Sequence, residues 1–134
     1  MGLDNGLYVT SDKRMITREM LPEGIVFPFD NDYGDRVEIA YWRKCWGLRD
    51  AILRRFGDLP NEYITDIDTP EKVMELIEEI ASWLDEEKWE DEGRSIWSYD
   101  EIRRSLVQNI VNLSIIYTVM LGNPDVYLQF YDSY

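Results

Sequence analysis

The sequence predicts an α+β fold in which a small, mainly antiparallel sheet packs against three helices. Short segments rich in aromatic and β-branched residues lie near both ends of the chain, as is typical of strands. Three longer segments carry apolar residues at three- and four-residue spacing, as is typical of helices. No repeat or linker divides the 134 residues, so we expect a single domain over 1–134 that buries a core without disulfides or metal.

The first and last parts of the chain supply the expected strands. "LYVT" at 7–10 and "GIVFPF" at 24–29 have strand composition. Pro28 marks the second as an edge strand or a strand end, because proline cannot donate a hydrogen bond to a neighbouring strand. The polar connection between them has room for one helical turn, and 30–36 is a turn cluster. A short strand near 63–64 and a last strand in "DVYLQFY" at 125–131 complete the prediction.

The segment at about 41–56 has the spacing of a helix with one apolar side. That side contains Trp42, Cys45, Trp46, Arg49, Ile52, Leu53 and Phe56. Gly57 follows as a helix stop. We expect Trp42 and Trp46 to face the core, and the stem of Arg49 to pack there while its guanidinium pairs with a carboxylate.

Two further helices are predicted at about 70–87 and 99–121. Thr69 and Pro70 suit the N-cap and first position of the former. Ser98 and Glu101 have the spacing of a capping box at the start of the latter. This last helix is apolar on nearly every side, so we expect it between the other helices and the sheet. Its many apolar positions also allow a homodimer.

Charge and composition exclude several kinds of chemistry. The formal net charge of −13 disfavours binding to nucleic acid and to anionic membranes, and favours a basic protein surface as partner. The chain has no His, which excludes Ser–His and Cys–His nucleophilic pairs and imidazole metal sites. Its single cysteine, Cys45, cannot form an internal disulfide or a thiolate zinc site.

The sequence is expected to belong to a cytoplasmic protein. Its first residues lack the basic start and apolar run of a secretory signal. The most apolar stretch, at 110–122, is shorter than the roughly 20 residues that span a bilayer. A lone thiol also suits a reducing compartment.

Two motifs resemble a family of small phage and prophage proteins with no established activity. "MGLDNGLYV" at 1–9 and "VEIAYWRK" at 37–44 are similar to the MGLDMYLY opening and the E-I-x-Y-W-R-K segment of that family. "TPEKVMELIEEI", "YDEIRRSLVQNIVNL" and "DVYLQFYDSY" follow in the same order of elements. Relatives often carry a His where this chain has Arg49, so chemistry based on that His does not carry over. The resemblance implies a phage-accessory origin and this order of elements, and it brings no established reaction. We expect no cofactor.

The leading interpretation is a non-catalytic accessory protein that binds a basic host or phage protein through an acidic surface. Residues 70–93 carry ten acidic residues against two lysines, a composition that is also typical of a solvated helix face. Two tryptophans within the acidic run and just beyond it would anchor a partner. The candidate binding residues are Glu86, Glu87, Trp89, Glu90, Asp91, Glu92 and Trp97.

Two alternatives remain open at this point. A metal-dependent hydrolase would use clustered carboxylates near strands and turns, namely Asp4, Glu38, Asp66 and Asp68. Asp4 also suits a tight turn, and Asp66 and Asp68 also suit a loop before a helix. A nucleic-acid-binding protein would use Arg43, Lys44 and Arg54 of the basic segment 36–55. We expect that segment instead to neutralise acidic residues of its own chain, because the charge of the whole molecule repels nucleic acid.

Overall fold

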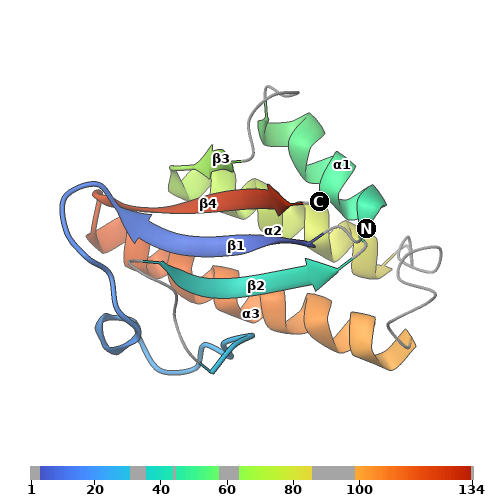
Figure 1. The fold of residues 1–134 in the computed structure, drawn as a ribbon, viewed down its shortest axis with the longest axis horizontal. Helices are drawn as coiled ribbons and strands as arrows, with labels where there is room; N and C mark the ends of the chain where they lie inside the picture. The colour runs from blue at the N-terminus through green and yellow to red at the C-terminus, as the bar shows by residue number, and fades with distance from the viewer. Residues whose placement is uncertain (1–3, 31–35, 44, 58–63, 86–98, 134) are drawn as a thin grey trace.

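The computed structural model describes residues 4–30, 36–43, 45–57, 64–85 and 99–133. These residues form an antiparallel four-stranded sheet and three α-helices (Figure 1), which confirms the predicted α+β class. The order of the strands across the sheet is β2-β1-β4-β3. In chain order the elements are β1 (Asp4–Ser11), the 3-10 helix η1 (Arg18–Met20), β2 (Val37–Arg43), α1 (Trp46–Phe56), β3 (Ile64–Ile67), α2 (Pro70–Asp85), α3 (Tyr99–Gly122) and β4 (Val126–Ser133).

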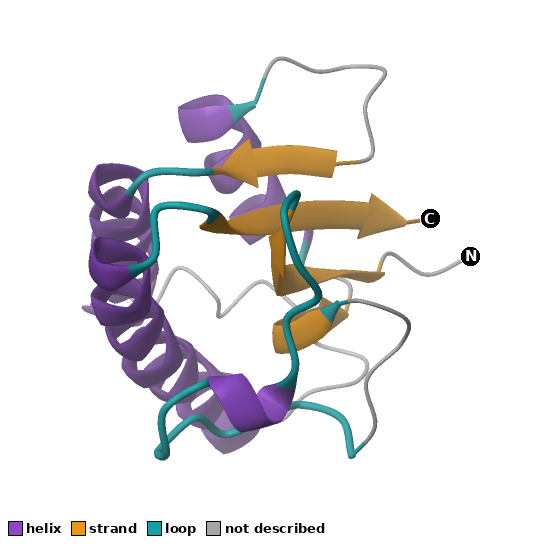
Figure 2. Ribbon diagram, turned by 90° about the vertical axis from the view of Figure 1, so that its left-hand side faces the viewer, coloured by secondary structure: helices purple, strands orange, loops and turns teal. Residues whose placement is uncertain are grey.

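The two longer helices cover one face of the sheet. Helices α2 and α3 lie side by side and run in opposite directions (Figures 1 and 2). Successive side chains of a strand point to opposite faces, so every second strand residue faces these helices. In β4 the inward residues Val126, Leu128 and Phe130 are at most 2% exposed, while Tyr127 and Gln129 point to the opposite face. Helix α1 packs against α2 and β3.

The first helix begins five residues later than the sequence predicts. Residues 41–43 belong to β2, which pairs with β1 on both sides of a bulge at Ile39. Trp42 is therefore buried from a strand, next to the ring of Phe130, and the prediction that it faces the core is confirmed. Trp46, the first residue of α1, is 44% exposed, so the same prediction for it is wrong. Gly57 ends α1 as expected, and its N–H donates to the carbonyl of Leu53.

The predicted strand at 24–29 does not form. Gly24 has a φ of +104° and Pro28 has no N–H, so neither supports a ladder. The N–H and C=O of Val26 instead bond to the side-chain amide of Asn112 in α3, each at 2.9 Å. The predicted strand near 63–64 is the edge strand β3, whose described part begins at Ile64.

The second helix agrees with the prediction over its described residues. Thr69 accepts the N–H of Lys72 through its hydroxyl at 3.2 Å, which confirms the N-cap. Residues 86–87, predicted to continue α2, and Ser98, predicted to cap α3, lie outside the described ranges.

Helix α3 lies beside α2 on one face of the sheet and not between the sheet and the other helices, so the prediction of its place is wrong. Glu101–Gly122 is long and apolar enough to cross a membrane by length and composition alone, which corrects the length expected from the sequence. One side of the helix is buried as in a core helix, at Ile102, Leu106, Leu113, Ile116 and Met120. The opposite side is exposed, at Val107, Val111 and Leu121.

Candidate functional site

The helix-free face of the sheet carries most of the polar side chains that contact one another across strands. We call it the outer sheet face. In Figure 1 it faces the viewer, and α2 and α3 lie behind it. Its strand residues include Asp4, Gly6, Tyr8, Thr10, Glu38, Tyr41, Arg43, Ile64, Asp66, Tyr127, Gln129 and Tyr131. Tyrosines and carboxylates dominate this set.

A tyrosine–carboxylate cluster lies over Gly6 in the middle of β1. The hydroxyl of Tyr131 donates to Oε1 of Glu38, and the hydroxyl of Tyr41 donates to Oδ1 of Asp4 at 2.7 Å. A Cβ at Gly6 would lie 2.7 Å from Oε1 of Glu38 and 3.0 Å from the ring of Tyr131. The glycine therefore leaves the space in which the Glu38 and Tyr131 side chains meet across β1.

The cluster is electrostatically unusual at Glu38. Burial raises the pKa of Glu38 to about 7, and the Tyr131 hydroxyl and the charge of Arg36 only partly oppose this shift. Burial and the hydrogen bond to Asp4 raise the pKa of Tyr41 to about 12. Burial and the bond to Glu38 raise the pKa of Tyr131 still further. At neutral pH the tyrosines are hydrogen-bond donors, and Glu38 can gain or lose a proton.

A second line of contacts crosses the sheet from β1 to β3. The hydroxyl of Tyr8 donates to Oε1 of Gln129 at 2.5 Å, and Nε2 of Gln129 donates to Oδ1 of Asp66 at 2.6 Å. The guanidinium of Arg36 lies 4.6 Å from the centre of the Tyr8 ring, within cation–π range. These contacts fix the orientation of three side chains on three neighbouring strands.

An acidic hollow of about 370 Å³ lies where β1 ends and β4 begins. It is lined by Asp12, Lys13, Asp66, Asp68, Pro124, Asp125 and Tyr127. Tyr127 donates its hydroxyl to Asp12 at 2.7 Å, which raises the pKa of this tyrosine to about 12. The bond from Lys72 lowers the pKa of Asp68, and the bond from Arg14 lowers that of Asp125.

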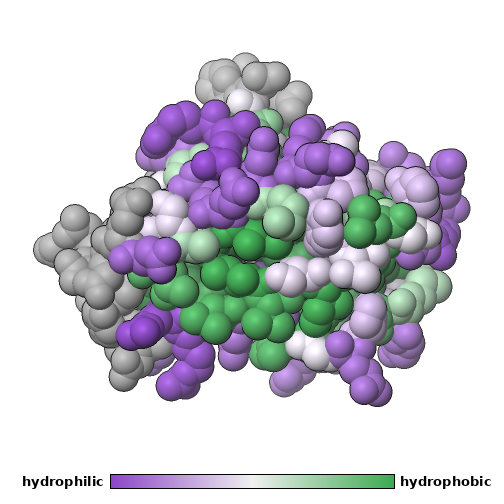
Figure 3. Space-filling model, turned by 180° about the vertical axis from the view of Figure 1, so that it is seen from behind, coloured by the Kyte–Doolittle hydropathy of each residue, from purple (hydrophilic) through white to green (hydrophobic). Residues whose placement is uncertain are grey.

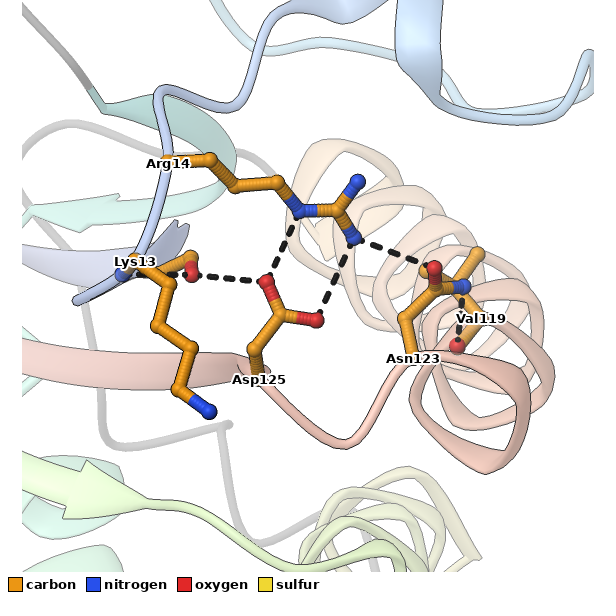
Figure 4. A network of polar contacts seen from close by, with 6 residues as sticks. Lys13, Arg14, Val119, Asn123 and Asp125 are labelled. Atoms are coloured by element: carbon orange, nitrogen blue, oxygen red, sulfur yellow. Dashed lines mark hydrogen bonds and ion pairs between the residues drawn. The ribbon is translucent and has the colours of Figure 1, made fainter.

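The rim of the acidic hollow is tied to the end of α3 (Figure 4). Arg14 donates to both oxygens of Asp125, at 2.8 and 3.3 Å, and to Oδ1 of Asn123 at 3.0 Å. The hydroxyl of Ser11 donates to the same carboxylate at 2.9 Å, and Asn123 in turn donates to the carbonyl of Val119. This network holds the Asp125 carboxylate in place at the mouth of the hollow.

The four carboxylates predicted as metal ligands do not share one pocket. Asp66 and Asp68 line the acidic hollow, while Asp4 and Glu38 belong to the tyrosine–carboxylate cluster. Within the described ranges, no group of three or more Asp, Glu or Cys side chains is placed to hold a metal ion. The convergence that a metal-dependent hydrolase requires is not seen for these four residues.

The basic segment mostly pairs with acids of the same chain, as predicted. Arg49 lies 2.6 Å from Asp132, and Arg55 lies 3.0 Å from Glu79 of the acidic helix α2. Arg43, a nucleic-acid candidate, lies 3.9 Å from Asp4. Of the other two candidates, Arg54 lines a hollow between α1 and α2 that also contains Asp50 and Glu79, and Lys44 lies outside the described ranges.

The residues predicted to bind a partner, Glu86 to Glu92 and Trp97, also lie outside the described ranges.

Sequence reasoning missed the tyrosines Tyr8, Tyr41 and Tyr131 of the outer sheet face. Their signal is the alternation of β1, β2 and β4, which places every second residue on one face. Register across strands, which the sequence does not give, decides which of them meet.

The described parts of the two motifs that carry the family resemblance form β1 and β2, which pair with each other beneath the tyrosine–carboxylate cluster. Comparisons with models of protein families, with curated proteins and with solved structures return no match.

Proposed function

We propose that this chain is a non-catalytic phage- or prophage-type accessory protein that binds a basic protein surface, and that the outer sheet face makes the contact. One observation carries the proposal. The sheet leaves one face free of helices, and on that face tyrosine hydroxyls and carboxylates are held in fixed positions by one another.

Tyr41, Tyr127 and Tyr131 are half-buried and suit such a contact, because a tyrosine ring supplies apolar area while its hydroxyl bonds to a partner. Tyr8 is 2% exposed and only supports its neighbours. Carboxylates beside the rings attract lysine and arginine, and the net charge of −13 accelerates the approach of a cationic partner. Glu86 to Glu92, beyond the described end of α2, would extend the same attraction.

A fluorescently labelled oligolysine peptide tests the chemistry of recognition. We expect its anisotropy to rise with protein at low salt and the binding to weaken at high salt. The acidic hollow adjoins the outer sheet face, because Asp66 and Tyr127 belong to both. The triple variant Asp12→Asn, Asp66→Asn, Asp68→Asn at this hollow should weaken binding roughly tenfold, since each exposed charge contact contributes up to about 1 kcal/mol. The matched control removes the same number of exposed charges from outside the outer sheet face, as Glu19→Gln, Glu23→Gln, Glu78→Gln, and should change binding by less than about twofold.

Equal weakening by both triple variants would show that only net charge matters, and would remove the outer sheet face as the site. Loss of binding only in the variant Glu86→Gln, Glu87→Gln, Glu90→Gln, Glu92→Gln would also move the site away from the sheet, to the segment after α2.

A further inference from the structure

Helix α3 presents an exposed stripe on the side of the molecule opposite the outer sheet face. Figure 3 shows a continuous hydrophobic band there, bordered by hydrophilic side chains. The α3 stripe consists of Val107, Val111, Ser114, Thr118 and Leu121, all exposed. Their spacing of four, three, four and three residues is that of a seam between two packed helices.

The polar members of the α3 stripe need no partner for their hydroxyls. Ser114 donates to the carbonyl of Ile110 at 2.8 Å, and Thr118 donates to that of Ser114 at 3.3 Å. Small side chains at the centre also let a second backbone approach closely.

We propose that a second copy of this chain covers the α3 stripe, with the two α3 helices antiparallel and the twofold axis near Ser114. The stripe is then self-complementary, as a twofold interface requires, because Val107 of each copy lies opposite Leu121 of the other. This interface goes beyond the proposed binding function, and it leaves both outer sheet faces uncovered.

The distribution of charged residues near the two ends of α3 favours an antiparallel over a parallel arrangement of the two helices. Arg103 and Arg104 are exposed one turn before the stripe and make no ion pair with a described residue. The last turn of α3, at the negative end of its dipole, contains no basic residue. Because α2 runs antiparallel to α3, its exposed Glu71 and Glu75 lie at that same end (Figure 1).

In an antiparallel pair, the two arginines of each copy approach the acidic end of the other copy. In a parallel pair, arginines would face arginines. The same acidic rim repels anionic lipid, which disfavours a membrane as the occupant. Positions 107 and 121 are about 21 Å apart along the helix, so the contact is short and the dimer should exchange with monomer.

Cysteine cross-linking tests the axis directly. The native Cys45 is buried, so we expect little cross-linking of the wild-type protein. Ser114→Cys should form an intermolecular disulfide on mild oxidation, because the two copies of position 114 face each other. Val107→Cys should not, because an antiparallel pair holds its two copies about 21 Å apart, beyond the roughly 7 Å that a disulfide allows. Cross-linking of Val107→Cys but not Ser114→Cys would overturn the antiparallel arrangement.

Sedimentation velocity over a range of concentrations tests the interface itself. Val111→Glu should weaken dimerisation at least about tenfold, because it places a charge near the axis. Ile64→Glu, at a comparably exposed apolar position on β3, should leave dimerisation unchanged. Arg103→Glu with Arg104→Glu should also weaken the dimer, and adding Glu71→Arg with Glu75→Arg should restore it. A monomeric wild-type protein at all concentrations would overturn the proposal, as would binding of the wild type to phosphatidylcholine vesicles that Val111→Glu abolishes.

Discussion

Nε of Arg49 in α1 lies 2.6 Å from Oδ2 of Asp132 in β4, and the two side chains are 15% and 5% exposed. This ion pair joins the first helix to the last strand across 83 positions of sequence. The same guanidinium lies 3.0 Å from Asp50, whose side chain is 57% exposed. One arginine thus has a buried and an exposed carboxylate partner, which permits a direct comparison.

Removal of the buried partner should cost far more stability than removal of the exposed one. Asp132→Ala leaves a largely buried guanidinium without its closest counter-charge, and we expect a loss of about 3 kcal/mol in the free energy of unfolding. Asp50→Ala removes an exposed ion pair and should cost less than about 1 kcal/mol. Urea unfolding followed by tryptophan fluorescence measures both. Equal losses would contradict the view that burial sets the strength of this pair.

Asn112 should be far more sensitive to substitution than Asn109, although both are buried asparagines of α3. Asn112 bonds to the N–H and C=O of Val26 and to the C=O of Ile39, while Nδ2 of Asn109 has no partner among the described residues. Asn112→Leu leaves three backbone groups unpaired and should cost roughly 3 kcal/mol or more. Asn109→Leu should be close to neutral or stabilising, because it removes an unsatisfied donor.

The same denaturation assay compares the two variants, and the far-UV circular dichroism of both should match the wild type. If Asn109→Leu were destabilised as much as Asn112→Leu, the hydrogen bonds of Asn112 to Val26 and Ile39 would not be the cause of its sensitivity to substitution.

The sequence predicted those elements whose signals are local. Helix α2 has its cap at Thr69, Pro70 in its first position and a regular apolar stripe, and these agree with the structure. The predicted start of α1 was wrong because β2 contains a bulge. Leu7 pairs with Ala40 and Tyr8 with Glu38, so Ile39 is an extra residue that interrupts the two-residue alternation. Without that alternation, the spacing from Trp42 onward looked helical.

The outer sheet face could not be assembled from the sequence for a different reason. Tyr8 and Gln129 are 121 positions apart, and Glu38 and Tyr131 are 93 apart. Their contacts depend on the strand order β2-β1-β4-β3 and on register, which are set by packing of the whole core. The pairing of Arg49 with a carboxylate was predicted from its place on an apolar side, but the identity of Asp132 depends on the position of the last strand.

Gly6→Ala should be strongly destabilising. A Cβ at this position would lie 2.3 Å from the carbonyl oxygen of Ala40, a backbone atom on the paired strand that cannot move away without breaking the ladder. We expect a loss of more than about 2 kcal/mol. Gly122→Ala is the control, because no atom lies within 4 Å of a Cβ at this position. Within a helix, alanine is more stable than glycine by up to about 1 kcal/mol, so this variant should not be destabilised. A small effect at Gly6, measured by urea unfolding, would show that β1 and β2 can separate locally.

The stability of the protein should fall as pH rises from about 4.5 to about 7, because of Glu38. Its pKa in the folded protein is about 7, against 4.5 for the ordinary carboxyl group. In this window the folded protein retains a proton that the unfolded chain has lost, so unfolding releases a proton and higher pH favours it. The full shift corresponds to about 3 kcal/mol, and the partial exposure of the carboxyl group reduces the expected change to roughly 1 kcal/mol.

The matched variant Glu38→Gln should lose this pH dependence, because glutamine does not titrate. Asp68 and Asp125 have lowered pKa values, so their contribution is lost only at more acidic pH and is the same in both proteins. The difference in the free energy of unfolding between wild type and Glu38→Gln, measured in urea at several pH values, isolates Glu38. A constant difference across the window would mean that Glu38 titrates as an ordinary solvated carboxyl group, and that the Tyr131 hydroxyl and surrounding water keep it ionised despite its burial.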